Sequence, residues 1–178
     1  MKNVKDLKIG TALRRIVRVV IPVLVFFVAQ PAPVQAQSSH STIGIYGGYV
    51  NNNKGAEAGV FFNYAFKEHL RIGSDVGIVF RNNDRSGMLV DINAHVPFSI
   101  GRFEVYPLAG VNYSSWNLHF IDGEGVDGKE RYNRFGMNAG AGAAMMVSST
   151  LRLGIEGCYT WVKHNDTGRV RLSIGYLF

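Results

Sequence analysis

The sequence contains a single cysteine, Cys158, among its 178 residues. One cysteine excludes a disulfide bond within the chain, so we expect a free thiol that is buried inside the fold. The sequence also lacks three motifs: a glycine-rich phosphate-binding loop, a paired set of cysteines, and a pair of histidines at metal-ligand spacing. No cofactor and no metal centre are therefore predicted.

Long apolar runs are nearly absent, and the clearest one lies near the N-terminus, between Val19 and Ala29. It spans roughly eleven residues and contains Pro22, whereas a helix needs about twenty residues to cross a bilayer. Basic residues precede this run, and a cleavage site of small residues ends at Ala36. The arrangement predicts a signal peptide over residues 1–36 and one further domain over residues 37–178.

Most of the positive charge of the chain belongs to this leader. Six of the 19 Lys and Arg residues and one of the 13 Asp and Glu residues lie in it, so the remaining domain has a net charge near +1. A nearly neutral domain gives no reason to expect a nucleic acid as partner.

Helical periodicity is absent from the domain. Eight segments instead alternate between apolar and polar side chains, which predicts eight β-strands. Most of them are close to the roughly ten tilted residues with which a strand crosses a bilayer. The expected strands are Thr42–Val50, Glu57–Phe66, Leu70–Arg81, Gly87–Pro97, Phe103–Trp116, Asn133–Val147, Leu151–Lys163 and Arg169–Phe178.

The connections between these strands are of two kinds. Tight turns alternate with longer polar segments that are rich in Asn, Asp and Gly. Transmembrane barrels show this asymmetry, with short turns on the periplasmic side and longer loops outside. We therefore expect both ends of the domain on the periplasmic side and the longest loop, Ile121 to Tyr132, outside.

The two faces of the predicted strands differ in polarity. One set of alternating positions, which includes Val76 and Ile155, carries no charge, and the other set, which includes Asp75 and Glu156, carries many. A barrel in lipid places its apolar face outward, and a soluble barrel has the opposite polarity. The sequence thus predicts an all-β, eight-stranded antiparallel up-and-down transmembrane β-barrel, closed by pairing of its first and last strands.

Aromatic residues fall where they would form two bands at the membrane interfaces. Near the loops the expected band contains Tyr49, Phe80, Tyr113, Trp116, Tyr132, Tyr159 and Trp161. Near the turns it contains Phe66, Phe98, Phe103, Tyr176 and Phe178.

The strand number, the loop asymmetry and the terminal Tyr176-Leu-Phe178 resemble the small outer-membrane β-barrel family of the OmpX and OmpA transmembrane-domain type. The resemblance covers about residues 41–178 and carries no catalytic signature. It implies location in the outer membrane of a Gram-negative bacterium, contact with lipid and lipopolysaccharide, and a monomeric state. It also implies delivery by periplasmic chaperones and insertion by the barrel-assembly machinery, with Tyr176 and Phe178 as the assembly signal.

The interior of an eight-stranded barrel is just wide enough for side chains, so we expect its charges to form a packed ionic network. A narrow conducting path for small solutes is the alternative. The expected network comprises Glu57, Arg71, Asp75, Asp91, His95, Glu104, Arg134, Arg152, Glu156, Arg169 and Arg171, with His95 as a partner of Glu104.

A lipid A-modifying enzyme is the third alternative, because such chemistry needs a nucleophile, a base and an acid close together. The candidates are His119 with Ser114 or Ser115 and with Asp122 or Glu124, although the motif of the lipid A deacylases is absent. The segment 122–128 resembles a calcium loop but has Val126 where an oxygen ligand is required. We expect a non-catalytic barrel with a structural or interaction role at the cell surface, in envelope integrity or in adhesion through its extracellular loops.

Overall fold

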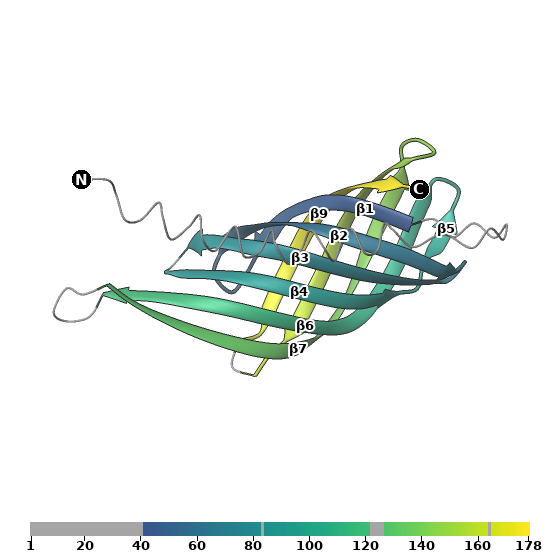
Figure 1. The fold of residues 1–178 in the computed structure, drawn as a ribbon. Coiled ribbons are helices and arrows are strands. Elements are labelled where there is room, and N and C mark those ends of the chain that lie inside the picture. Colours follow the sequence, from purple (N-terminus) through teal and green to yellow (C-terminus); the bar gives the residue numbers. More distant parts are fainter. Residues whose placement is uncertain (1–40, 83, 122–126, 164) are drawn as a thin grey trace, which may run out of the picture. The chain divides into compact units, whose positions relative to one another are not determined.

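The computed structural model describes residues 41–82, 84–121, 127–163 and 165–178. In this part of the chain no helix is long and apolar enough to cross a membrane. The described residues form one sheet of antiparallel strands (Figure 1). The strands are β1 (Ser41–Val50), β2 (Gly55–Lys67), β3 (Leu70–Asn82), β4 (Arg85–His95), β5 (Phe98–Ile100), β6 (Phe103–Ile121), β7 (Asp127–Met146), β8 (Leu151–Trp161) and β9 (Thr167–Leu177).

The sheet closes on itself into a barrel. Each of the long strands pairs with its neighbours in the chain, and β1 pairs with β9 over its length. The short strand β5 continues the line of β4 beyond Pro97, because both strands pair with β6, so the ring contains eight strand positions. The predicted pairing of the first and last strands is confirmed, and backbone hydrogen bonds of 2.9 Å in both directions between Ser41 and Phe178 extend it to the last residue.

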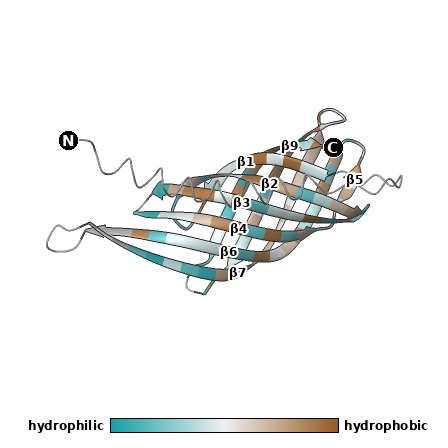
Figure 2. Ribbon diagram, viewed as in Figure 1, coloured by the Kyte–Doolittle hydropathy of each residue, from teal (hydrophilic) through white to brown (hydrophobic). Residues whose placement is uncertain are grey.

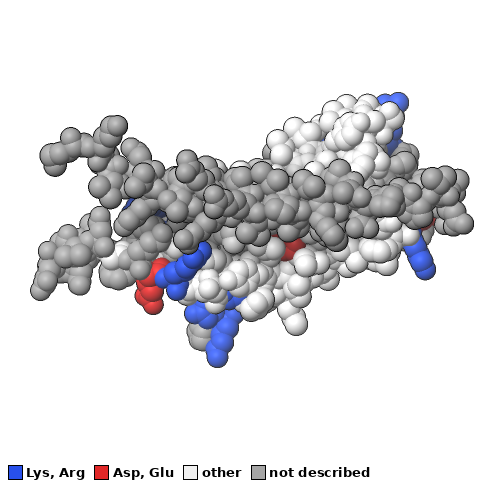
Figure 3. All heavy atoms as spheres, viewed as in Figure 1, with Lys and Arg blue, Asp and Glu red and all other residues white. Residues whose placement is uncertain are grey.

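Alternation of side chains makes the barrel apolar outside and polar inside, as the sequence predicts. Large apolar side chains stand on the outer surface, and the most exposed of them, Phe135, has 80% of its surface accessible. One residue before it, Arg134 faces the interior. Figure 2 shows the alternation as brown and teal positions that follow one another along the strands. On the face visible in Figure 3, Lys and Arg side chains lie mainly toward the ends of the barrel. An exterior of this kind is stable in hydrocarbon and not in water.

The hairpin of β6 and β7 is much longer than the sequence predicts. The two strands have 19 and 20 residues, and they stay in register from the pair Phe103 and Met145 to the pair Ile121 and Asp127. The segment expected as a long loop, Ile121 to Tyr132, is therefore largely strand. Its middle, residues 122–126, lies outside the described residues. Figure 1 shows this hairpin reaching beyond its neighbours at the loop end of the barrel.

Ten of the twelve aromatic residues assigned to the interfacial bands do lie on the outer face. Trp116 and Tyr132 do not: Trp116 is fully buried inside the barrel, and Tyr132 packs against it from the neighbouring strand. Position along the strand suggested the loop-side band, but alternation decides the face. Counted from Asn112 and Arg134, which face inward, both aromatic residues fall on inward positions.

Deletion of Phe178 is expected to reduce the amount of folded barrel in the outer membrane and to leave unfolded protein in the periplasm. The deletion removes two hydrogen bonds of the seam with Ser41 and an exposed aromatic ring that stacks on Tyr176 at the turn-side interface. Heat-modifiable gel mobility of membrane fractions measures the folded fraction. Phe103→Ala removes a similarly exposed ring away from the seam and should fold nearly as well as the wild type. Equal folded fractions for the deletion and the wild type would contradict this expectation.

Candidate functional site: the barrel interior

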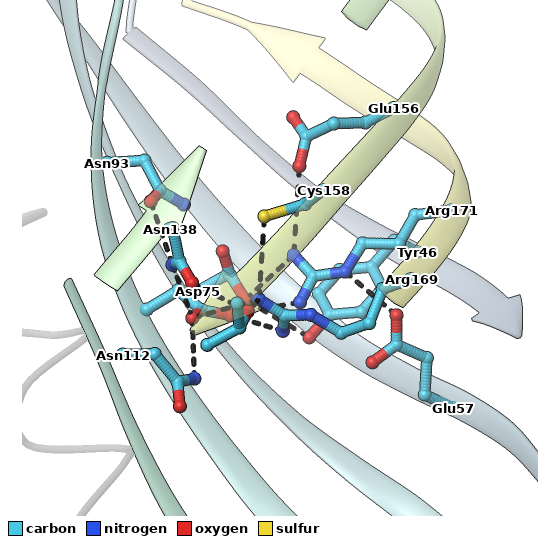
Figure 4. A network of polar contacts seen from close by, with 12 residues as sticks. Tyr46, Glu57, Asp75, Asn93, Asn112, Asn138, Glu156, Cys158, Arg169 and Arg171 are labelled. Atoms are coloured by element: carbon cyan, nitrogen blue, oxygen red, sulfur yellow. Dashed lines mark hydrogen bonds and ion pairs between the residues drawn. The ribbon is translucent and has the colours of Figure 1, made fainter. Parts of the chain in front are cut away.

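Arg171, on β9, lies at the centre of the interior and contacts carboxylates from several other strands (Figure 4). Its Nε donates to Glu57 Oε1 at 2.8 Å, its Nη1 to Asp75 Oδ1 at 3.1 Å and its Nη2 to Asp91 Oδ2 at 3.0 Å. A fourth carboxylate, that of Glu156, lies 3.8 Å from Nη1. The planar guanidinium has donors in several directions, which allows one side chain to serve all of these acids.

Asp91 is the second centre, and it is completely buried. Arg169 binds it in a bidentate manner, with Nη1 to Oδ2 at 2.6 Å and Nη2 to Oδ1 at 3.1 Å. The amides of Asn112 and Asn138 donate to Oδ1 at 2.7 and 2.8 Å. A buried carboxylate is tolerated when its lone pairs are filled by charged and polar donors in this way.

A smaller ionic group lies closer to the turns, around Glu104 on β6. Glu104 Oε1 accepts from Arg71 Nη1 at 2.9 Å and from Arg152 Nη2 at 2.6 Å. Both guanidinium groups also lie over the ring of Tyr106, at 4.8 and 5.4 Å from its centroid. The Tyr106 hydroxyl donates to Glu156 Oε2 at 3.2 Å, which connects this group to the carboxylates around Arg171.

Two of the expected network residues have other contacts than the sequence suggested. His95 was assigned to Glu104, but its Nδ1 accepts a hydrogen bond of 3.2 Å from Arg71 Nε, and Arg71 in turn contacts Glu104. Arg134 lies over the ring of Tyr132 at 5.4 Å, and no ion pair joins it to a carboxylate of the described residues. The structure thus brings ten of the eleven residues together in two connected groups.

Tyrosines inside the barrel were not among the predicted site residues, yet they organise both groups. The Tyr46 ring lies 4.5 Å below the Arg171 guanidinium, and its hydroxyl donates to Asp75 Oδ1 at 3.2 Å. Space for the two tyrosines comes from glycines on other strands: a Cβ at Gly77 would overlap Tyr46, and one at Gly142 would overlap Tyr106. Even-numbered residues of β1 and β6 face the interior, so alternation along these strands could have predicted that both rings point inward.

The loop end of the interior is closed by apolar side chains. Val50, Val79, Leu89 and Trp116 form one fully buried cluster, which we name the apolar plug, and Tyr132 packs against it. Above it, asparagines connect the loop-end segments: Asn52 Nδ2 donates to Asn165 Oδ1, and Arg85 Nη1 donates to Asn52 Oδ1 at 3.1 Å. The sequence predicted a polar interior, and this apolar plug was not predicted.

Cys158 is a buried free thiol, as expected. Its Sγ lies 3.8 Å from Arg169 Nη2, and its other neighbours include Tyr106 and Leu108. It therefore fills space at the edge of the network.

The candidate catalytic residues do not share one face of the barrel. Ser114 faces the interior, where its Oγ is 3.4 Å from the Arg134 carbonyl oxygen, and Ser115 on the opposite face accepts from Arg131 Nε at 3.0 Å. The backbone of His119 pairs with Lys129 in the long hairpin. Asp122 and Glu124, together with most of the calcium-like segment, lie outside the described residues. Among the residues that the structure describes, no group of three or more His, Cys, Asp or Glu side chains is arranged to hold a metal ion.

A closed antiparallel sheet, an exposed apolar exterior and buried charges within define a transmembrane β-barrel. The family follows from a sequence profile that matches residues 22–178: the chain belongs to the outer membrane protein beta-barrel domain family. It is therefore a protein of the Gram-negative outer membrane. A comparison with curated proteins finds no match.

Solved structures with the same fold include three bacterial proteins. The N-terminal β-barrel domain of Pseudomonas aeruginosa OprF is 15% identical with a TM-score of 0.62, and 79% of this chain covers 98% of that one. Ail, the attachment invasion locus protein of Yersinia pestis, is 16% identical with a TM-score of 0.59, over 80% of this chain and all of that one. Neisserial surface protein A is 15% identical with a TM-score of 0.59, over 79% of this chain and 96% of that one.

Proposed function

We propose that this barrel is a non-catalytic interaction protein of the cell surface, which binds partners through its extracellular end while its interior serves stability. The observation that carries the proposal is the β6–β7 hairpin. Its register continues to Ile121 and Asp127, whereas β7 pairs with β8 only from Met137 onward. Residues 127–136 thus extend past β8, and this edge of β7 has no strand partner among the described residues.

The edge offers the chemistry of a binding surface. An unpaired strand edge presents backbone N–H and C=O groups that an extended segment of a partner can pair with. Several exposed side chains along it are polar or charged, among them Glu130, Arg131 and Asn133, and Phe135 at its base is apolar and exposed. In water such side chains keep the edge soluble, and in a complex they select the partner.

The filled interior supports a structural role over the alternative of a narrow pore. The apolar plug blocks the loop end, and the guanidinium and carboxylate groups below it bind one another at 2.6 to 3.1 Å. Conduction requires a continuous path whose binding sites an ion can enter and leave. Side chains that are bound to one another across the lumen leave no such path.

The similar structures agree with a surface role, since one is an attachment invasion locus protein and another a surface protein. Their identities of 15 and 16% carry the fold alone, so attachment enters here as a proposal. The proposal has four further parts. The apolar belt contacts lipid and lipopolysaccharide, and the barrel-assembly machinery inserts the barrel through Tyr176 and Phe178. The leader is cleaved after Ala36, and the barrel is a monomer.

Replacement of residues 119–129 by Asn-Gly tests this function. Leu118 and Glu130 are paired in the register, so a two-residue turn there should close a shorter hairpin and leave the barrel intact. We expect normal heat-modifiable mobility and a loss of adhesion of the bacteria to epithelial cells or to one another. A variant with Ser148-Ser149-Thr150 replaced by a two-residue turn alters the opposite end and should adhere normally. Unchanged adhesion of the folded short-hairpin variant would refute the proposed role.

The two alternatives predict other phenotypes. A pore predicts solute-dependent conductance of the purified barrel in planar bilayers, and a lipid-modifying enzyme predicts a change of lipid A mass in a deletion strain. We expect neither change.

A further inference from the structure

A small cavity lies between the two ionic groups, on the turn side of Arg171. Its volume is about 40 Å³, which is enough for one small ion or very few water molecules and too small for an organic ligand. The residues around it are Tyr46, Phe61, Asn63, Gly73, Asp75, His95, Tyr106, Arg152, Glu156, Arg171 and Ser173.

Among the described residues, the acidic side chains become more accessible toward the turn end of the barrel. The carboxylates nearest to the apolar plug, those of Glu57 and Asp91, have no accessible side-chain surface. Asp75, which is paired with Asp91 across β3 and β4, is 9% accessible, and the fraction rises to 16% for Glu156 and to 20% for Glu104 near the turns. This gradient favours entry of a small species from the turn end.

The charges around the cavity do not balance. Five carboxylates belong to the two connected ionic groups, but only four guanidinium groups do, because Arg134 lies apart from them over Tyr132. In the central group four carboxylates share only Arg169 and Arg171, whereas Glu104 alone has Arg71 and Arg152. Asp75 and Glu156 both depend on Arg171 Nη1, and the 3.8 Å separation of Glu156 is the longest of these ion pairs. An uncompensated buried negative charge is costly, so the site calls for a small positive species.

A second, independent observation concerns an amide that faces the cavity. The Asn63 side chain lines it and is buried to 6% exposure, yet its amide forms no hydrogen bond with the described residues. Cross-strand from it lies Gly73, and a Cβ there would overlap Asn63 Oδ1, so the glycine leaves room for the amide. Buried amides without a protein partner are normally satisfied by water or an ion.

We propose that this cavity binds one small monovalent cation, of the size of sodium. Carboxylate oxygens of Asp75 and Glu156, the Asn63 carbonyl oxygen and the Ser173 hydroxyl are the available ligands, and hard oxygen ligands suit such an ion. Two carboxylates next to two guanidinium groups disfavour a divalent ion. The bound cation neutralises the surplus charge and ties the turn-side group to the central one.

The test is the stability of the purified barrel in zwitterionic detergent, in sodium chloride and in N-methylglucamine chloride at equal ionic strength. The organic cation is too large for the cavity. At a sodium concentration ten times the dissociation constant, the unfolding equilibrium constant should be about tenfold smaller in sodium. Glu156→Gln and Asn63→Ala should remove this difference. Glu130→Gln, which makes the same charge change at an exposed site, should retain it.

Sodium binding can also be measured directly, which keeps the proposal testable if one variant folds poorly. Sodium-23 NMR lines should broaden in the presence of the wild-type barrel more than with the folded Glu156→Gln variant. Equal stability of the wild type in the two salts, or equal line widths, would overturn the proposal. Stability that depends on pH and not on the cation would assign the surplus charge to a bound proton and would overturn it as well.

Discussion

Replacement of Arg171 by methionine is expected to destabilise the barrel by about 3–5 kcal/mol. Methionine fills a similar length but leaves the buried carboxylates of Glu57, Asp75 and Asp91 without their shared cation. Asp91 keeps Arg169, whereas Glu57 has no other ion pair among the described residues. Denaturant unfolding in lipid vesicles, followed by gel mobility, measures the change in the free energy of unfolding.

The matched control is Arg81→Met, which breaks an ion pair with Asp84 whose side chains are 58% and 69% exposed. Because water solvates both charges there, its loss should cost no more than about 1 kcal/mol. Arg171→Lys should fall between the two, since it keeps the charge but lacks the planar set of donors. If Arg171→Met were as stable as Arg81→Met, the ionic groups would contribute nothing to stability, and the role proposed for the interior would fail.

The faces of the barrel were predictable because hydrocarbon enforces alternation. Val76 and Ile155 have charged neighbours in the sequence, and only one face of each strand tolerates a charge. Closure was predictable for a similar reason, since an open edge in lipid leaves backbone groups without partners. Both inferences depend on the solvent outside the barrel and not on detailed packing.

The same alternation contained the apolar plug, but residue type hid it. Val50, Val79 and Leu89 fall on inward positions, counted from Gly48, Gly77 and Asp91. The inward face is recognised in the sequence by its charged and polar residues, so apolar residues on that face give no signal. Trp116 was assigned to the interfacial band from its position along the strand.

Two further features could not be read from the sequence. The extension of β6 and β7 mixes apolar residues such as Leu118 with glycine and charged residues such as Glu130, so it lacks the clear alternation of the membrane strands. The pairing of particular acids and bases depends on how far the strands are staggered around the ring. Arg171 meets Glu57 and Asp91, which are 114 and 80 residues away in the chain, and no local pattern encodes such contacts.

Arginine at Ile155 or Val76 is expected to cost about 2–4 kcal/mol of folding free energy in bilayers. Both side chains point away from the interior near the middle of their strands, and their cross-strand neighbours, among them Leu172 and Val90, are also apolar. A guanidinium there must lose its hydration or draw water into the hydrocarbon.

Depth and face supply the controls for this prediction. Ile100→Arg makes the same substitution in the turn-end strand β5, where 74% of the side chain is accessible, and should cost about 0–1 kcal/mol because the charge reaches the interface. Glu156→Gln changes the charge on the inner face, one residue after Ile155. Because Glu156 forms only a weak ion pair at 3.8 Å, this variant should lose less folding free energy than Ile155→Arg. The measurement is again denaturant unfolding in vesicles. Tolerance of arginine at Ile155 and Val76, combined with failure of Glu156→Gln to fold, would mean that the inner and outer faces are exchanged and that this chain does not fold in a membrane.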